Sequence, residues 1–320
     1  MSSLHFKERF NLLQATVETR VHGKPEAVRL ALTCLFAEGN LLIEDVPGVA
    51  KTLLAKTIAG SIEGGTYQRI QFTPDLLPTD ITGVEIFNPG TGRFDFRPGP
   101  VFANVLIGDE INRAAPRTQS ALLQAMAEGE VTVGRTTHQI RPPFFCVATQ
   151  NPIEHRGTYD LPEAQLDRFL MRITIGYPAP HDEKTVLVQG ITGASHEPVT
   201  PVLHVDEIGR LVSAARAVPV GEAVQDYLVR IATATRISPA VHLGVSPRGT
   251  IALAAAARVV AASWGRQFTS PDDVKEVAIP VLAHRLILTQ EALMQGLTAT
   301  KVIQDVINTV PVPRHPGGDR

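Results

Sequence analysis

The sequence predicts an α/β domain followed by an all-helical domain, and three observations support this division. Strand-like segments recur through the first part of the chain, at 41–43, 67–72, 105–107, 144–149 and 171–178. Segments whose apolar residues have helical spacing lie between most of them. From Asp182 onward the periodicity is helical only. Strands that alternate with helices are typical of a parallel sheet, so we expect five parallel strands before residue 180 and a helical domain after it.

The composition is that of a globular protein without a general affinity for nucleic acid. Hydrophobic residues make up 44% and charged residues 19% of the 320 residues, enough for about two domains. A net charge of -2 gives no general attraction for nucleic acid, although a local basic patch stays open. The two cysteines, Cys34 and Cys146, lie in apolar runs and are expected to be buried and unpaired. No leader opens the chain and no apolar run is of membrane-spanning length, so we expect a cytoplasmic protein.

A short turn separates the first two predicted helices. Apolar residues recur every three or four positions between Phe6 and Val17, which predicts a helix within residues 1–20. The turn at 21–24 follows, and Pro25 is suited to the first turn of the next helix.

The stretch LLIEDVPGVAKT, residues 41–52, combines a strand, a tight loop and the start of a helix. Backbone N–H groups at a helix start lack intrahelical partners and carry the positive end of the helix dipole, so they attract anions. A lysine there adds a charge for terminal phosphates, and a threonine hydroxyl can bind Mg²⁺. The stretch predicts a nucleotide-phosphate site formed by Asp45, Val46, Pro47, Gly48, Val49, Ala50, Lys51, Thr52 and Leu53.

Two positions depart from the phosphate-loop motif G-x-x-x-x-G-K-[ST]. Asp45 stands at the first glycine and Ala50 at the second. We expect Asp45 to tolerate a left-handed backbone and Ala50 to suit the start of the helix. The alternative is an ordinary strand–turn–helix connection with a surface lysine. If a nucleotide binds, the earlier turn with Val21 and Gly23 is a candidate wall for its base.

An insertion rich in Pro, Gly and Thr follows the second strand, over residues 73–104. It contains two short β-like pieces, at 84–87 and 93–97. We interpret it as an element that faces a substrate or a partner. A surface connection without a special role is the alternative.

Two adjacent carboxylates, Asp109 and Glu110, follow the apolar strand at 105–107. In α/β folds, ligand chemistry gathers at the carboxyl ends of parallel strands. One carboxylate there can hold Mg²⁺, and the next can polarise an attacking water. The alternative is a pair of charges at a solvated strand end, but the phosphate loop upstream favours the catalytic interpretation.

A helix, a hairpin and another buried strand come next. The helix is expected over residues 118–129 and the β-hairpin over residues 130–142. The tip of the hairpin either contacts a client chain or has no special role. The strand at 144–149 ends in Gln150 and Asn151, whose amides can hydrogen-bond a water or a γ-phosphate without adding charge.

Two arginines stand out in the remainder of the chain. Arg168 lies near the end of a helix that begins around Pro162, where a cation also simply stabilises a helix C-terminus. Ser246 and Pro247 place Arg248 in the first turn of an Ala-rich helix. A cation there opposes the helix dipole by up to roughly 1 kcal/mol, so we expect it to meet an anion.

Together these motifs resemble the MoxR family of AAA+ ATPases, over about residues 10–310. Three stretches resemble the family's phosphate loop, its magnesium and base strand end and its second sensor: EDVPGVAKT (44–52), DEINRAAPR (109–117) and SPR (246–248). Two more resemble the segment after the second strand and the region of the first sensor: RIQFT with DLLP and DITG (69–83), and ATQNPIEHRGTYDLPEAQLDRF (148–169).

The resemblance implies an α/β AAA+ P-loop ATPase domain over residues 1–180, with a parallel five-stranded sheet flanked by helices. The helix-2 insert would lie at about 84–98 and the hairpin before the first sensor at about 130–142. A small all-α lid would follow over residues 181–310, and residues 311–320 would form a disordered tail.

The resemblance also implies a role for each candidate side chain at the sheet. Lys51 would bind the β- and γ-phosphates of ATP, and Thr52 with Asp109 would hold Mg²⁺. Glu110 would activate the attacking water, and Asn151 would be the first sensor.

Two arginines would complete the site. Arg168 would be a finger supplied to the ATP of a neighbouring subunit, although Arg113, Arg117 and Arg156 lie in segments that can also reach an interface. Arg248 would extend from the lid to the γ-phosphate of its own subunit.

The implied function is hydrolysis of ATP to ADP and phosphate, coupled to remodelling, maturation or activation of a client protein, including metal or cofactor insertion. A finger supplied in trans requires a ring, so the family expectation is a homo-oligomeric ring, a hexamer, often with a partner that carries a von Willebrand factor A (VWA) domain. A DNA-acting AAA+ motor is the first alternative, and the near-neutral charge and lack of a DNA-binding motif oppose it. A non-hydrolysing scaffold is the second, and the intact candidate residues oppose it.

Overall fold

The computed structural model describes residues 3–152, 157–192 and 199–313, which group into two compact units. The first, called the α/β unit below, contains residues 12–169 and 173–209. The second, called the helical unit, contains residues 3–11, 170–172 and 210–313. Helix α7 (Pro180–Thr192) therefore groups with the α/β unit, whereas the sequence places a boundary at residue 180. Periodicity marks where strands cease, and it carries no information on which elements pack together.

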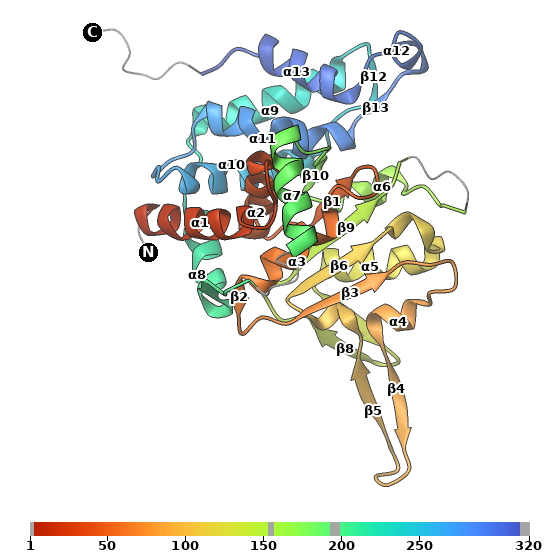
Figure 1. The fold of residues 1–320 in the computed structure, drawn as a ribbon. Coiled ribbons are helices and arrows are strands. Elements are labelled where there is room, and N and C mark those ends of the chain that lie inside the picture. Colours follow the sequence, from red (N-terminus) through yellow and green to blue (C-terminus); the bar gives the residue numbers. More distant parts are fainter. Residues whose placement is uncertain (1–2, 153–156, 193–198, 314–320) are drawn as a thin grey trace. The chain divides into compact units, whose positions relative to one another are not determined.

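The structure contains a five-stranded sheet in the order β10–β1–β9–β6–β3 (Figure 1), and four of these strands, β1, β9, β6 and β3, lie in the α/β unit. The pairs β1–β9, β9–β6 and β6–β3 are parallel. The predicted five-stranded parallel sheet is thereby confirmed. Its strands are β1 (Leu41–Glu44), β3 (Tyr67–Gln71), β6 (Val105–Asp109), β9 (Phe145–Gln150) and β10 (Met171–Ile173).

The register of these strands brings polar residues to one edge of the sheet. Glu44 is paired with Gln150, and Gln71 with Asp109. Strand β1 has β9, β6 and β3 on one side and β10 on the other, so the direction in which strands are added changes at β1. Ligands of open α/β sheets bind outside such a point, at the carboxyl ends of the strands.

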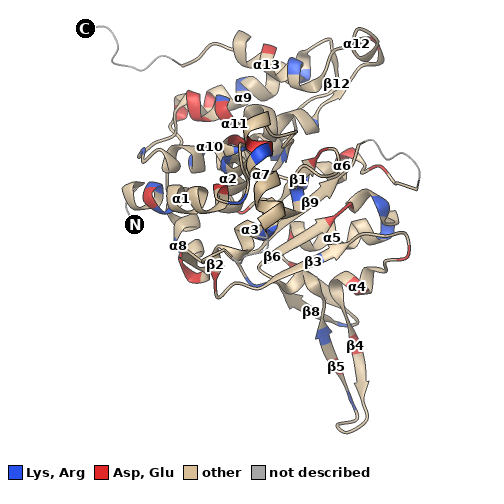
Figure 2. Ribbon diagram, viewed as in Figure 1, with Lys and Arg blue, Asp and Glu red and all other residues tan. Residues whose placement is uncertain are grey.

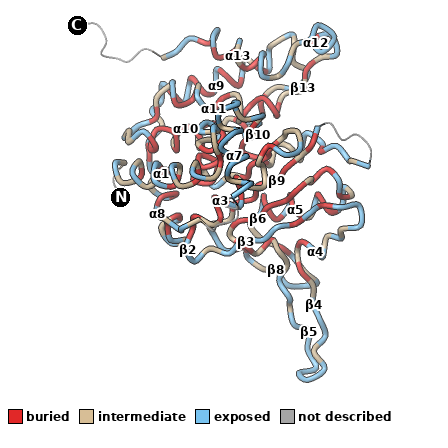
Figure 3. The backbone as a smooth tube through the Cα atoms, viewed as in Figure 1, coloured by how far each residue is buried: buried red, intermediate tan, exposed pale blue. Residues whose placement is uncertain are grey.

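The core of the α/β unit explains why these strands stay in place. All residues of β6 are buried, and in β9 only Gln150 is partly exposed (Figure 3). Helix α5 (Pro116–Glu128) packs Leu122 and Leu123 into the same cluster as Phe72 and Phe169. The helix begins two residues before the predicted start, because Pro116 occupies its first turn.

Two hairpins extend from the α/β unit, in the regions where the sequence indicates β structure. One consists of β4 (Gly83–Asn88) and β5 (Arg93–Pro98), the other of β7 (Glu130–Val133) and β8 (Thr136–Gln139). The β4–β5 hairpin projects away from the sheet and is exposed along most of its length (Figure 1, Figure 3). Both signs of charge occur on it (Figure 2).

The helical unit is helical as predicted but also contains a short strand pair. Its helices after residue 217 are α9 (Glu222–Ile237), α10 (Pro247–Ser263), α11 (Pro271–Leu282), α12 (Gln290–Met294) and α13 (Ala299–Thr309). Strands β12 (Val241–Leu243) and β13 (Ile287–Leu288) pair in antiparallel fashion. The expectation of no strand after Asp182 is wrong at these positions and at β11 (Leu203–His204), which pairs with β2 (Ile62–Glu63). Strands of two or three residues are too short to show a period.

The other helices of the chain are α1 (Ser3–Glu18), α2 (Pro25–Phe36), α3 (Lys51–Gly60), α4 (Pro78–Thr82), α6 (Glu163–Leu166) and α8 (Val205–Arg216). Short 3-10 turns are η1 (Pro100–Phe102), η2 (Ile111–Arg113) and η4 (Ala283–Arg285). Within the described residues, no helix has the length and apolarity needed to cross a membrane. Most of the predicted tail, residues 314–320, lies outside the described residues.

Candidate functional site

The phosphate loop joins β1 to α3, and its backbone differs from the expectation. Gly48 has φ +85° and Ala50 has φ 64°, both in the left-handed region, and Ala50 directly precedes α3. Asp45 is not among the residues with positive φ. Ala50 stands at the start of the helix as expected, but it also carries the left-handed turn, at a cost of roughly 1 kcal/mol relative to glycine. Asp45 does not need its tolerance of that backbone and acts through its side chain instead.

The Asp45 carboxylate holds the loop against the segment that follows β10. Its Oδ1 accepts a hydrogen bond from the Val46 N–H at 2.8 Å. Its Oδ2 accepts from the N–H groups of Ile175 and Gly176, at 2.7 and 2.6 Å. Charge-assisted hydrogen bonds of this kind are among the stronger ones in proteins. Glycine at position 45 could make none of the three.

Lys51, the first residue of α3, lies between the ends of two neighbouring strands. Its Nζ donates to the Asp45 carbonyl oxygen and to the Gln150 carbonyl oxygen, the latter at 3.2 Å. The first N–H groups of α3 have no carbonyl partner within the helix. The ammonium group and these N–H groups thus form one positive region at the loop.

The Thr52 hydroxyl lies against the carboxylate of Asp109, at 3.0 Å from Oδ1 and 3.2 Å from Oδ2. Asp109 is only 4% exposed, and its Oδ1 also accepts from the Thr149 hydroxyl at 3.3 Å. The hydroxyl and carboxylate that the sequence assigns to one metal ion are therefore adjacent, although they are 57 positions apart. Thr149, on β9, was not predicted, because its role depends on the parallel register of β6 and β9.

Glu110 has a left-handed backbone, with φ 58° and ψ 52°. Its N–H donates to the Thr149 hydroxyl at 3.0 Å. Its Oε2 accepts from Gln71 Nε2 at 2.7 Å and from Arg113 Nη1 at 2.9 Å. A non-glycine residue in this conformation costs roughly 1–2 kcal/mol, and such strain concentrates at functional sites.

Arg69 adds a contact to the Asp109 carboxylate that the sequence did not predict. Its Nε donates to Asp109 Oδ2 at 2.7 Å. Arg69 and Gln71 lie two residues apart on β3, so their side chains extend from the same face of that strand. Strand β3 thereby supplies one partner to each of the two adjacent carboxylates.

The end of β9 brings two amide side chains to the same edge. Asn151 is buried, with 4% exposure. Gln150 Oε1 is buried without a hydrogen-bond partner in the described part of the chain. By contrast, Cys146 lies inside β9, away from its carboxyl end, and burial raises the pKa of its thiol to about 12. Cys34 and Cys146 are both buried, as predicted, and neither forms a disulfide.

Comparisons with known proteins identify the family of this chain. Residues 40–171 match the ATPase family associated with various cellular activities (AAA), and residues 233–306 match the AAA lid domain. Chaperone MoxR1 of Mycobacterium tuberculosis is 43% identical over 93% of this chain and 81% of its own length. The Bacillus subtilis protein YeaC is 46% identical over 91% of each chain. The chain belongs to the MoxR family of AAA+ ATPases.

A solved structure has the same fold as this MoxR-family chain. The crystal structure of a candidate ATPase from Cytophaga hutchinsonii superposes with a TM-score of 0.90 and 34% sequence identity, over 98% of this chain and 97% of the other. Nucleotide binding, generally with Mg²⁺, and ATP hydrolysis are general properties of AAA+ ATPases. These proteins typically form rings, and MoxR proteins work with partners.

The arginines predicted to complete a MoxR site lie at different places. Arg168 Nη1 donates to the Leu123 carbonyl oxygen of α5 at 2.6 Å, and Arg113 contacts Glu110. Arg117 is exposed in the first turn of α5. Arg248 is exposed in the first turn of α10, where the Ser246 hydroxyl accepts from the Gly249 N–H at 3.2 Å. Arg156 lies outside the described residues.

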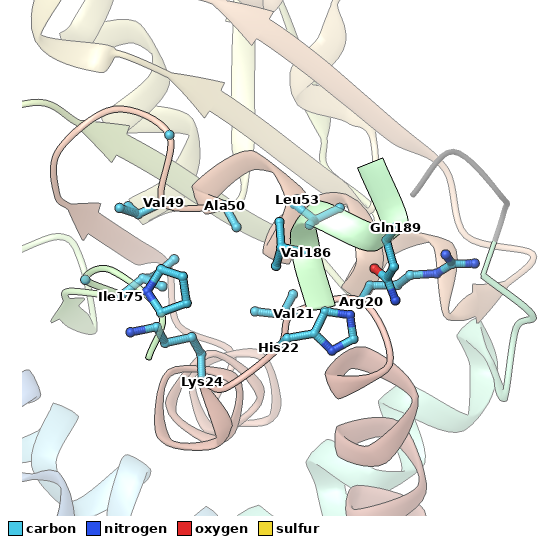
Figure 4. Close-up of a pocket in the computed structure, with 13 residues that line it drawn as sticks. Arg20, Val21, His22, Lys24, Val49, Ala50, Leu53, Ile175, Val186 and Gln189 are labelled. Atoms are coloured by element: carbon cyan, nitrogen blue, oxygen red, sulfur yellow. The ribbon is translucent and has the colours of Figure 1, made fainter. Parts of the chain in front are cut away.

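A pocket beside the phosphate loop has the walls expected for a nucleotide base. Its empty volume is about 640 Å³, a value that includes the solvent at its open mouth. Figure 4 shows Val21, Ile175 and Val186 around the same space. Its apolar lining consists of Val21, Val49, Ala50, Leu53, Ile175, Pro178 and Val186, and Gly48, Gly176 and the polar residues Arg20, His22, Lys24 and Gln189 complete it.

Gly23 supports this pocket without lining it. Its φ is +69°, and a Cβ at this position would lie 2.0 Å from a carboxylate oxygen of Asp182. The next residue, Lys24, donates from Nζ to the Tyr177 carbonyl oxygen at 2.7 Å. The turn therefore lies against α7 at Gly23 and contacts the segment after β10 at Lys24. Val186 and Gln189 were not predicted, because the sequence places α7 in a separate domain.

The residues present fit a magnesium nucleotide. A hydroxyl and a buried carboxylate lie side by side at the start of α3, and oxygen ligands of this kind suit Mg²⁺. A lysine and a helix N-terminus lie beside them for phosphate. An apolar pocket with polar groups at its rim adjoins the same loop.

Proposed function

We propose that this chain binds ATP with Mg²⁺ at the carboxyl edge of its sheet, hydrolyses it to ADP and phosphate, and uses the reaction to remodel or activate a client protein. The contact between the Thr52 hydroxyl and the Asp109 carboxylate carries the proposal. It joins the phosphate loop to the strand end that bears Glu110, which is the juxtaposition that phosphoryl transfer to water requires.

Each residue at the edge has a specific task in this proposal. Lys51 and the N–H groups of α3 bind the β- and γ-phosphates, and the loop from Asp45 to Leu53 surrounds them. Thr52 and Asp109 hold Mg²⁺, which neutralises charge on the phosphates when it is bound. Glu110 accepts a proton from the attacking water. Asn151 hydrogen-bonds this water or the γ-phosphate, and Val21 with its neighbours holds the base.

Two observations support the client role: one of the relatives is a chaperone, and one hairpin exposes aromatic side chains. Chaperone MoxR1 is a relative over most of its length. The β4–β5 hairpin exposes Phe87 at 52% and Phe94 at 66%, with their rings 5.4 Å apart. An exposed aromatic pair on a projecting hairpin is suited to contact another protein. Activation by metal or cofactor insertion, with a VWA-domain partner, is the specific form that the family resemblance favours.

A homo-oligomeric ring, a hexamer, is the assembly that we propose, with Arg168 extending to the ATP of a neighbour. Its hydrogen bond to Leu123 uses one of five guanidinium N–H groups. The remaining donors suffice for a bidentate contact with phosphate. Arg248, in the lid proposed for residues 181–310, acts on the γ-phosphate of its own subunit.

The first experiment measures ATP binding by calorimetry with and without Mg²⁺, and phosphate release. The wild-type protein is expected to bind and to turn over. Lys51→Ala is expected to lose most of the affinity, whereas Arg135→Ala, in the exposed turn between β7 and β8, retains it. A folded wild-type protein that gives no heat with millimolar ATP and Mg²⁺ would contradict the proposal. Turnover that depends on DNA would favour the DNA-acting alternative.

The second experiment tests the ring. Glu110→Gln and Arg168→Ala subunits are each expected to be nearly inactive, the latter by about 10³-fold if Arg168 acts as other fingers do. Mixing them is expected to restore part of the activity, because some interfaces then pair an intact base with an intact finger. Absence of recovery in a mixed assembly, shown by native mass spectrometry, would remove Arg168 from this role.

A further inference from the structure

We propose that Arg69 competes with the divalent metal ion for the Asp109 carboxylate, so that the metal binds only as the guanidinium leaves. This inference rests on the proposed function, in which Asp109 holds the metal. Arg69 is thereby a positioning residue that sets the metal concentration at which the site is filled. None of the motifs in the sequence assigns it a role at the metal.

The two members of the Arg69–Asp109 pair differ in exposure. Arg69 lies on the edge strand β3, and its Nε is 2.7 Å from Asp109 Oδ2. The side chain of Arg69 is 55% exposed, whereas that of Asp109 is only 6% exposed. The carboxylate is therefore held in the protein, and the guanidinium is the member of the pair with room to move.

Hydroxyl and guanidinium groups surround the two oxygens of the Asp109 carboxylate. Oδ1 lies within hydrogen-bond distance of the hydroxyls of Thr52 and Thr149, at 3.0 and 3.3 Å. Oδ2 lies within the same reach of Arg69 Nε and the Thr52 hydroxyl, at 2.7 and 3.2 Å. A hydroxyl rotates to offer a lone pair to a metal, but a guanidinium has no lone pair to offer. Thr52 can therefore give up its hydrogen bond to Asp109 and bind the same metal ion as Asp109, whereas Arg69 cannot bind a metal.

Two cations at the same carboxylate oxygen repel each other. A metal ion on Oδ2 would lie about 4 Å from a guanidinium that stayed on the same oxygen, and at this distance two cations in a partly buried site repel strongly. Binding of either cation therefore weakens binding of the other. Two effects of opposite sign are then distinguishable: a competing Arg69 weakens metal binding, whereas an Arg69 that merely orients Asp109 strengthens it.

The test replaces Arg69 with glutamine, which keeps an N–H donor and removes the charge. Binding of Mn²⁺ in the presence of ADP is followed by the loss of the free-ion EPR signal, so no turnover is needed. The half-saturating Mn²⁺ concentration is expected to fall about fivefold in Arg69→Gln, the size of effect that removal of one half-exposed ion pair gives. Arg135→Gln, a charge-matched change in an exposed turn, is expected to keep the wild-type value.

The possible outcomes distinguish a failure of the proposed competition from a failure of the proposed function. An unchanged or higher half-saturating concentration in Arg69→Gln, with normal metal-dependent ADP binding in the wild-type protein, overturns the competition and leaves the proposed function intact. Wild-type protein that binds neither ADP nor Mn²⁺ overturns both. If Arg69→Gln does not fold, Arg69→Lys takes its place, because lysine retains the charge without the fixed Nε geometry. It is expected to bind Mn²⁺ about twofold more tightly than the wild-type protein, and an equal or weaker value overturns the proposal.

Discussion

The carboxyl edge of the sheet and the β4–β5 hairpin belong to the same unit but are built in opposite ways. At the edge, polar groups are buried and paired, as in the contacts of Asp109 with Thr52, Thr149 and Arg69. On the hairpin, apolar groups are exposed, with Ile86 at 45% and Phe94 at 66%. Buried, preorganised polar groups suit chemistry, and exposed apolar groups suit association. In the proposed function, hydrolysis and client contact therefore belong to separate regions, which substitutions can separate.

The largest expected effect is at Glu110. Glu110→Gln removes the proton acceptor while preserving the shape of the side chain, so ATP turnover is expected to fall by about 10²–10⁴-fold with nucleotide affinity nearly unchanged. Turnover and calorimetry measure the two quantities. Glu85→Gln, an exposed carboxylate on β4, is the matched control in the hairpin. Equal losses in the two variants would abolish the distinction between the regions.

A smaller effect is expected at Asp45. Asp45→Asn keeps the shape but places an amide where three backbone N–H groups converge, so hydrogen bonds to a charged acceptor are lost. The free energy of unfolding is expected to fall by about 1.5–3 kcal/mol, and ATP affinity with it. On the hairpin, Asp95 accepts a hydrogen bond from Asn88 at 2.7 Å and from no other described residue, so Asp95→Asn is expected to change stability by about 0.5 kcal/mol or less. Chemical denaturation compares the two.

An effect of the opposite sign is expected at Ala50. Ala50→Gly relieves the left-handed backbone, φ 64°, and is expected to raise the free energy of unfolding by about 0.5–1 kcal/mol. Ala55→Gly, in the middle of the same helix α3, is expected to lower it by about 1 kcal/mol. If both changes destabilise equally, the left-handed strain at the phosphate loop is not significant for stability.

The smallest effect on hydrolysis is expected in the hairpin. With Phe87→Ser and Phe94→Ser combined, turnover by the protein alone is expected to stay within about twofold of the wild-type value, because neither ring is buried. Loss of the ring pair is expected to cost about 1 kcal/mol of stability or less. Stimulation by a client or binding to it is expected to be lost. A fall in basal turnover as large as that of Glu110→Gln would show that the hairpin acts in the chemistry.

The sequence was sufficient for the parts of the site that lie in continuous local patterns. Lys51 and Thr52 follow a strand and a loop, and Asp109 and Glu110 end an apolar run, so the five strands and these residues were predictable. Arg69 and Gln71 were missed because their partners are defined by strand register. Val186 and Gln189 were missed because the packing of α7 beside the loop is tertiary. Backbone conformation was the other gap: no local rule distinguishes Ala50 from Asp45 as the left-handed residue.

The three hydrogen bonds of the Asp45 carboxylate determine what a substitution toward the general phosphate-loop motif would do. They connect the phosphate loop to Ile175 and Gly176, both of which border the pocket proposed for the base. A single side chain thus keeps two ends of one ligand site at a fixed separation. Restoring the glycine of the general motif at position 45 would cut that tether, so a change toward the consensus would loosen this protein instead of repairing it.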